Sequence, residues 1–211
     1  MIVMCINLRE EYKKVEIFEK KIADYTGSKY AVCVDCCTNA LLLSFLQSKE
    51  QYVTLPTNTY VGVALAAHHA GKKIKFINSY WKGCYLIPPT NIYDSAKRFT
   101  CNMYIKKSIM CVSFHYKKHL KIGRGGAILT DSKTIANQLK LMRNCGKDVT
   151  KSMSKQTYNV VGYNMLMHPD LAEKGMELLK TLPKNNEDLP DEYYGDLEQQ
   201  LKPLLPNTII N

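Results

Sequence analysis

The sequence predicts an α/β fold, in which a mostly parallel sheet lies between layers of helices. Short apolar runs rich in β-branched residues alternate along the chain with segments whose apolar residues recur at helical spacing. The chain has 211 residues, 45% of them hydrophobic and 23% charged, which suffices for one packed core and excludes a disordered, collagen-like or low-complexity protein. No apolar run approaches the roughly 20 residues that a bilayer-spanning helix needs, so we expect a soluble protein.

Helix and strand alternate through the first part of the chain. Residues 8–25 place apolar side chains on one face and lysine and glutamate on the other, which predicts a helix that Gly27 ends. After this helix we expect strands at 30–34, 51–55 and 73–77, separated by helices at 38–46 and 59–70, with Gly71 as a cap.

The pattern loosens after Asn78, where we expect a loop as far as residue 90. Asp131 or Ser132 is placed to cap a helix that ends near Gly146, and Pro169 opens a helix that runs to residue 182. The segment between these two helices is predicted to be a polar loop over residues 147–159. The remaining strands are expected at 91–93, 109–113 and 126–130.

Charge and composition divide the chain into residues 1–182 and residues 183–211. The second part has four prolines and six acids against two lysines, a net charge of −4, and we expect a loosely packed acidic tail with one short helix. The whole chain carries +10, so the first part carries +14. Such a balance indicates an anionic partner, either nucleic acid, a membrane surface or a phosphorylated small molecule, or else a solvated lysine-rich surface without a partner.

The eight cysteines are read as thiols of the cytoplasm. The first eleven residues have no basic segment, apolar segment or cleavage site of a secretory signal, so we expect a cytoplasmic protein. Cys33, Cys36 and Cys37 include a Cys-x-x-Cys, but no second close pair accompanies it, and we predict no metal site. Buried thiols that pack as small apolar groups are the favoured interpretation.

Polar residues of the types that carry catalysis and binding follow several of the predicted strands. Because sheets of this kind place function at the carboxyl ends of their strands, we expect these residues to share one rim. A carboxylate ends one strand, a serine is followed five residues later by a lysine, and a threonine stands at a helix N-terminus whose backbone amides suit a phosphate. This set predicts a phosphorylated pyridine cofactor that a lysine holds as a Schiff base.

Six short motifs follow one another in a fixed order. They are Cys36-Cys37-Thr38-Asn39-Ala40-Leu41, Leu55-Pro56-Thr57-Asn58-Thr59-Tyr60-Val61, Tyr93-Asp94-Ser95-Ala96-Lys97, Ser113-Phe114-His115-Tyr116-Lys117-Lys118, Gly123-Arg124-Gly125-Gly126-Ala127 and Gly162-Tyr163-Asn164. In this order they resemble the sugar aminotransferases of the DegT/DnrJ/EryC1/StrS family, which are fold-type I enzymes that depend on pyridoxal 5′-phosphate (PLP). The resemblance implies a three-layer, mostly parallel sheet and identifies residues 1–182 as a shortened PLP-binding large domain.

The resemblance assigns catalysis to Lys118, which would form the Schiff base with the cofactor and then move the proton. Lys117 is the rival nucleophile, and the five-residue spacing from Ser113 favours Lys118. Relatives that act as sugar dehydratases carry histidine at this position, so the lysine favours amino transfer. Asp94 would pair with the pyridinium nitrogen and keep it protonated.

The remaining cofactor contacts are also implied by the resemblance. Tyr60 would stack on the ring, and Lys97 stands where the family has a glutamine near the cofactor's phenolic oxygen. Asn164 matches a residue that reaches the phosphate from the other subunit, which implies a homodimer with shared active sites. The phosphate would be held by Thr38, Cys37 and Ser113.

The implied function is transfer of an amino group from an amino acid, with glutamate as the expected donor, to a nucleotide-linked keto-deoxysugar. Residues 183–211 are too few for the small C-terminal domain of the family, which helps to close the site and bind the sugar nucleotide. The alternative is therefore a degenerate, non-catalytic relative that binds PLP or another subunit.

A third interpretation, binding of single-stranded nucleic acid, rests on the basic stretch at residues 106–124 with its aromatic residues. That stretch coincides with the lysine motif, whose charge already has a use, so nucleic acid is the least favoured partner.

Overall fold

The computed structural model describes residues 8–210. Cys5 and most of the amino-terminal segment in which we expect no secretory signal lie outside the described residues. The helices are α1 (Leu8–Thr26), α2 (Cys37–Gln47), α3 (Val61–His69), α4 (Lys133–Met142), the 3₁₀ helix η1 (Met153–Lys155), α5 (Pro169–Thr181) and α6 (Leu197–Leu201). The strands are β1 (Tyr30–Val34), β2 (Tyr52–Pro56), β3 (Lys73–Ile77), β4 (Tyr85–Ile87), β5 (Ile92–Asp94), β6 (Ile109–Ser113), β7 (Gly126–Thr130) and β8 (Ile209–Ile210).

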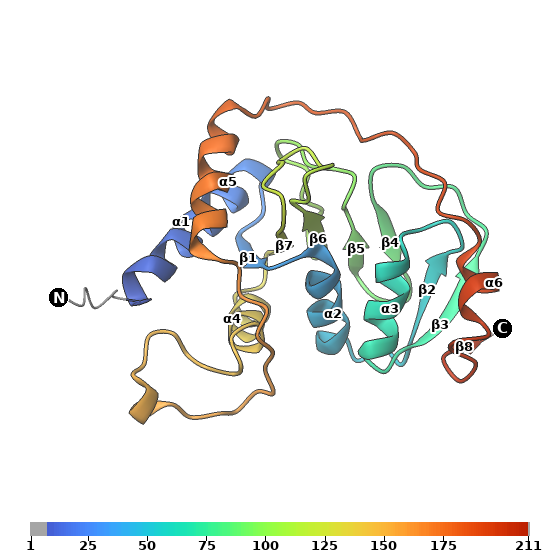
Figure 1. Ribbon diagram of the computed structural model, residues 1–211, viewed down its shortest axis with the longest axis horizontal. Coiled ribbons are helices and arrows are strands. Elements are labelled where there is room, and N and C mark those ends of the chain that lie inside the picture. Colours follow the sequence, from blue (N-terminus) through green and yellow to red (C-terminus); the bar gives the residue numbers. More distant parts are fainter. Residues whose placement is uncertain (1–7, 211) are drawn as a thin grey trace, which may run out of the picture.

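The strands form two sheets that continue into one another (Figure 1). The strand orders are β1-β7-β6-β5-β4 and β2-β3-β8, and the backbone N–H of Thr54 in β2 donates to the carbonyl of Pro88, just after β4, over 2.7 Å. Neighbours pair in parallel at β5–β6, β2–β3 and β3–β8, whereas β7 runs antiparallel to β1 and β6, and β4 antiparallel to β5. The predicted α/β class is confirmed, with a sheet that is mixed rather than mostly parallel.

The antiparallel direction of β7 has a simple cause. A parallel neighbour needs a long crossover, usually a helix, and the chain between β6 and β7 contains none. Residues 114–125 instead fold as a loop that returns the chain beside β6, with Gly123 and Gly125 at positive φ.

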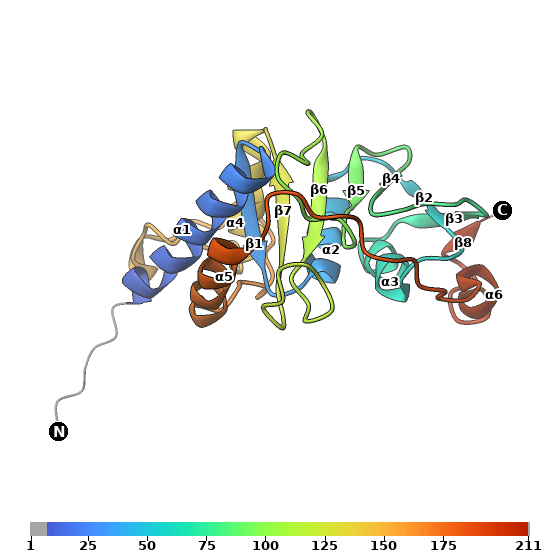
Figure 2. The same cartoon turned by 90° about the horizontal axis from the view of Figure 1, so that it is seen from above.

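Helices cover both faces of the sheet, so the three-layer arrangement is confirmed (Figure 2). Alternate residues of β1 point to opposite faces. Val32 and Val34 pack in one apolar cluster with α2, α3 and α4, whereas Ala31 and Cys33 pack in the other with α1 and α5. Both clusters are closed to water, since each of these four residues is at most 4% exposed.

Most expected elements lie where the sequence puts them, and Ser132 is the residue that caps α4. We expected the region after Asn78 to be loop as far as residue 90. This prediction is wrong, since the region contains β4. Its alternating pattern is short, with Tyr85 and Ile87 buried and Leu86 exposed. The expected polar loop at 147–159 holds only the single turn η1.

The C-terminal part is more tightly packed than its composition predicts. From the end of α5 it runs over the ends of the strands to the far edge of the sheet, where α6 and β8 lie (Figures 1 and 2). Leu197, Leu201 and Ile209 are buried in the same cluster as α2 and α3. We call residues 184–196, the part that crosses the strand ends, the strap. None of the helices between residues 8 and 210 is both long and apolar enough to cross a membrane.

Candidate active site

A cavity of about 340 Å³ opens at the carboxyl ends of the parallel strands, beneath the strap. This is the size of a small-molecule site. It is the edge at which an α/β sheet is expected to carry function. The lining residues are Cys36, Cys37, Thr38, Leu41, Thr59, Tyr60, Val63, Trp81, Asp94, Ala96, Lys97, Ser113, His115, Lys117, Lys118, Arg124, Gly125, Glu192 and Tyr194.

One end of the cavity is the N-terminus of α2, which follows β1 through a tight turn. Cys36 is the capping residue. The Cys36 thiol, a weak acceptor, is the partner of the Thr38 and Asn39 amides, and the helix dipole favours a stronger, negatively charged acceptor there. Gly126 makes the approach of β7 possible, because a Cβ at this position would lie 2.7 Å from the backbone nitrogen of Cys37.

A buried carboxylate lies at the floor of the cavity. Asp94 ends β5, is 4% exposed and accepts a hydrogen bond from the backbone N–H of Ala96 over 2.9 Å. Burial raises the pKa of this carboxyl, and the Ala96 amide, the Tyr85 hydroxyl and the cations of Lys118 and Lys97 oppose the rise. A carboxylate that burial destabilises gains from a cationic or N–H partner in the cavity.

Tyr85 supports this carboxylate from the neighbouring strand. It is the cross-strand partner of Asp94, and its hydroxyl lies 2.7 Å from the Thr59 hydroxyl. Burial raises the pKa of Tyr85 well above its usual value, and the charge of Asp94 adds to the rise. The phenol therefore keeps its proton and can donate a hydrogen bond.

The two adjacent lysines differ in exposure. Lys118 is half-buried and its backbone N–H donates to the His115 carbonyl over 2.8 Å, whereas the side chain of Lys117 is exposed. The charge of Lys118 opposes the burial-driven rise in the pKa of Asp94 and of Cys37. Its charge therefore acts on groups of the cavity interior, and the choice of Lys118 over Lys117 stays a prediction.

Lys97 lies close to two aromatic rings. Its Nζ lies 5.1 Å from the centre of the Trp81 ring and 5.2 Å from that of Tyr194, and it donates to the Pro190 carbonyl over 3.2 Å. Burial lowers the pKa of Lys97, the carboxylate of Glu192 opposes this, and the charge of Lys118 adds to it. The strap supplies three of these neighbours, namely Pro190, Glu192 and Tyr194.

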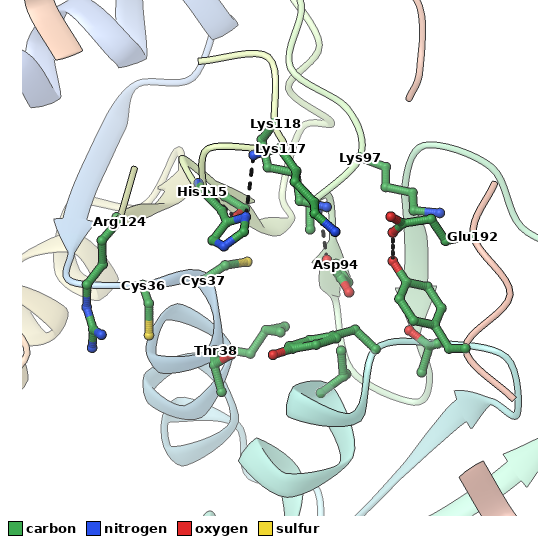
Figure 3. A pocket seen from close by; sticks show the side chains of 18 of the residues that line it. Cys36, Cys37, Thr38, Asp94, Lys97, His115, Lys117, Lys118, Arg124 and Glu192 are labelled. Carbon is green, nitrogen blue, oxygen red and sulfur yellow. Dashed lines mark hydrogen bonds between the residues drawn. The ribbon is translucent and has the colours of Figure 1, made fainter. Parts of the chain in front are cut away.

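The strap forms the wall opposite Arg124, as Figure 3 shows, with Asp94 between the two ends. The Tyr194 hydroxyl donates to Glu192, which lowers the pKa of that carboxyl and, together with burial, raises the pKa of the phenol. The Tyr194 ring meets the Tyr60 ring edge-on, with centroids 6.2 Å apart. At the other end, Arg124 donates to Asp35 over 3.1 Å.

The structure gathers all but one of the predicted site residues. Lys118, Asp94, Ser113, Thr38, Cys37, Tyr60 and Lys97 line the cavity, although their roles stay predictions. Asn164 does not: its side chain is exposed, and its backbone pairs with Asn144 next to the end of α4. Of the cations in the basic stretch, Lys117 and Arg124 also line the cavity, whereas Lys121 does not.

Sequence reasoning did not identify four residues of the site as such, namely Trp81, Tyr85, Glu192 and Tyr194. Trp81 follows β3, so the strand-end rule could have found it. Glu192 and Tyr194 lie in the acidic tail, and the opposite charges of tail and body were the available signal that the tail returns to a basic cavity.

Comparison with known proteins gives one family. The sequence model of the DegT/DnrJ/EryC1/StrS aminotransferase family matches residues 5–100 and 92–202. A UDP-4-amino-4,6-dideoxy-N-acetyl-beta-L-altrosamine transaminase of Campylobacter jejuni subsp. jejuni serotype O:23/36 is 26% identical over 83% of this chain. The chain spans 58% of the length of that relative.

Solved structures agree on the fold. A PLP-dependent aminotransferase of Bacillus cereus ATCC 10987 superposes with a TM-score of 0.68 at 18% identity, covering 82% of this chain and 59% of that one. The Helicobacter pylori aminotransferase PseC, involved in the biosynthesis of pseudoaminic acid, gives 0.61 at 16% identity, covering 81% and 58%. At these identities the likeness shows the shared fold alone.

Proposed function

The chain belongs to the DegT/DnrJ/EryC1/StrS aminotransferase family, and from that premise we propose that it is a PLP-dependent aminotransferase of nucleotide-linked sugars. One observation carries the proposal: a single cavity brings Lys118, the buried Asp94 and the N-terminal amides of α2 together at the ends of the strands.

The donor groups of the cavity fit PLP. The α2 N-terminus, Thr38 and Ser113 offer amides and hydroxyls to a phosphate dianion, and Arg124 lies at the same end. Asp94, whose pKa burial raises, is stabilised by a protonated ring nitrogen. Tyr60 is 54% exposed and can present its ring to a planar ligand. When bound, PLP supplies an aldehyde that reacts with amines and a ring that withdraws electrons.

Each residue then has a defined task. Lys118 would hold the cofactor through Nζ, and its free amine would act as the general base and acid that moves a proton. Asp94 holds the proton on the ring nitrogen, and Tyr85 holds Asp94 by a hydrogen bond from its hydroxyl. The strap covers the cavity and limits the access of water to these groups.

For the substrates we propose a nucleotide-linked keto-deoxysugar as acceptor and glutamate as donor. The name of the Campylobacter relative, a transaminase of a UDP-linked dideoxysugar, supports the acceptor. A structural neighbour, a GDP-4-keto-6-deoxymannose-3-dehydratase, was solved with a trapped PLP-glutamate species, which supports the donor. The cations Lys97, Lys117 and Arg124 give an anionic substrate attraction toward the cavity.

We also propose a homodimer in which Asn164 serves the site of the partner. The segment between α4 and α5 projects from the body (Figure 1) and carries exposed apolar side chains. Met153 is 69% exposed, Tyr158 60% and Val161 81%. Such a patch suits a subunit contact. Sedimentation of Val161→Asp, which should dissociate into monomers, tests the contact.

Spectroscopy with matched lysine variants tests the function. The purified protein should absorb in the visible range with PLP, and borohydride should fix the cofactor to Lys118, as peptide mapping by mass spectrometry would show. Lys118→Ala should lose the covalent link and reduce amino transfer by roughly 10²–10⁴-fold, whereas Lys117→Ala keeps both.

Two other results would contradict the proposal. A colourless protein with PLP, or a reducible link that persists in Lys118→Ala, would reject the cofactor assignment. A coloured protein whose spectrum glutamate does not change would instead support the non-catalytic alternative.

A further inference from the structure

The strap is held at several points along its length. The Leu189 N–H donates to the Lys97 carbonyl over 3.0 Å and the Tyr194 N–H to Asn58 Oδ1 over 2.8 Å, and just after the strap the Leu197 N–H donates to the Thr57 carbonyl over 3.0 Å. Because these acceptors lie in loops that follow β5 and β2, the strap is fixed to the same strand ends that form the cavity.

Asp188, in the middle of the strap, is held by an ion pair and fits into the space beside a glycine. Arg98 donates to Asp188 through Nε and Nη2, over 2.8 Å and 2.6 Å. The Asp188 carboxylate occupies the space beside Gly83, where a Cβ would lie 2.1 Å from its Cγ. Gly83 has φ of 69° and no side chain, so the backbone accommodates the carboxylate where any other residue would displace it. The wall that the strap presents is therefore an ordered surface.

The chemistry of this wall suits a hydroxylated ring. Tyr194, Tyr60 and Trp81 offer aromatic surface to the C–H face of a sugar. The Glu192 carboxylate accepts one hydrogen bond from the described residues, from Tyr194, and so keeps acceptor capacity for hydroxyl groups. At this end the cations of Lys97, Lys118 and Lys117 offset the charge of Glu192, whereas Arg124 and the α2 N-terminus favour anions at the other (Figure 3).

We propose that the strap is the sugar-binding wall of this site. Tyr194 packs against the pyranose ring, and Glu192 accepts hydrogen bonds from its hydroxyls. The proposal rests on the proposed function and adds to it the residues that distinguish a nucleotide sugar from its nucleotide.

The test compares UDP-N-acetylglucosamine with UDP as probes of the PLP-loaded protein. The two ligands share the nucleotide, so the ratio of their dissociation constants measures the contribution of the sugar to binding. Trp81, the single tryptophan of the chain, lies in the cavity and reports binding by its fluorescence. The native protein should bind UDP-N-acetylglucosamine more tightly than UDP. Tyr194→Ala should reduce this preference roughly tenfold, and Glu192→Gln about fivefold.

Neighbouring residues of the same segment provide the controls. Tyr193 is 86% exposed and does not line the cavity, so Tyr193→Ala should leave the preference unchanged. Glu187→Gln removes a charge from the strap at an exposed position outside the cavity and should do the same.

The outcomes separate this inference from the proposed function. Failure to bind PLP rejects the function. If PLP binds and the preference for the sugar is absent in the native protein, or is unchanged in Tyr194→Ala and Glu192→Gln, the strap is not the sugar wall. Equal loss of preference in the control variants would also overturn the inference.

Discussion

The two ends of the cavity are built in different ways. The α2 end, with the floor at Asp94, is formed by strand ends and a helix start, and behind it lies the apolar core. The end with Glu192 and Tyr194 is a single strand-free segment, held by backbone and side-chain hydrogen bonds and one ion pair. Because the two parts are built from different segments of the chain, we expect substitutions to separate the proposed cofactor chemistry from the proposed recognition of the sugar.

The largest expected effect is at the buried end. Asp94→Asn should slow amino transfer by roughly 10²–10³-fold, because a neutral amide does not hold the ring proton. The preference for UDP-N-acetylglucosamine over UDP should persist. The rate of the absorbance change after addition of glutamate measures the first effect. Asp191→Asn, on the strap, should change this rate by no more than about twofold, and an equally slow Asp191→Asn would remove the distinction.

A smaller effect is expected at the strap. Gly83→Ala should displace Asp188 and lower the sugar preference roughly tenfold, equivalent to about 1.4 kcal/mol, while PLP still binds. Gly71→Ala is the matched control. Both glycines have positive φ, 69° and 74°, but a Cβ at Gly71 would meet nothing within 4 Å. If both variants lose the preference equally, backbone strain rather than displacement of Asp188 is the cause.

The smallest expected effect is the change of protein stability with pH. The sign of this change differs between the carboxyls of Asp94 and Glu192. Burial raises the pKa of Asp94 above its usual 3.8, so the folded protein binds the proton more tightly than the unfolded chain. The free energy of unfolding therefore falls as the pH rises from about 3.8 through the raised pKa. The Tyr194 hydroxyl lowers the pKa of Glu192 below 4.5, so its contribution is present above 4.5 and is lost as the pH falls through the lowered pKa.

Melting temperatures of the cofactor-free protein measure both contributions. Relative to the native protein, Asp94→Asn should gain stability as the pH rises above 3.8, and Glu192→Gln should lose stability as the pH rises toward 4.5. Slopes of the same sign in the two variants would contradict the assignment of opposite environments to these carboxylates.

The buried end could be predicted from sequence and the strap could not. Asp94, Ser113 and Thr38 follow apolar strands or a sharp turn, and the edge at which parallel strands end is a property of the fold. The order of the motifs then predicted Lys118 as the reactive lysine. Glu192 and Tyr194 lie in a segment without strand or helical periodicity, whose course depends on distant partners such as Asn58 and Arg98.

The missed strand has a local cause. β4 has only three residues, too few for a periodic pattern to stand out. Asn164 lies outside the cavity of its own chain, so its assignment to the site of a partner subunit stays a prediction.

The pairing of β8 with β3 has a consequence for the making of the protein. Ile74 and Lys75 pair with Ile209 and Ile210, so the outer edge of β3 lacks its neighbour until the ribosome has made those residues. At usual synthesis rates this interval is on the order of 10 s. An open strand edge can associate with other chains in that time. The strap is likewise made late, so the strand ends that form the rest of the cavity are synthesised before this wall.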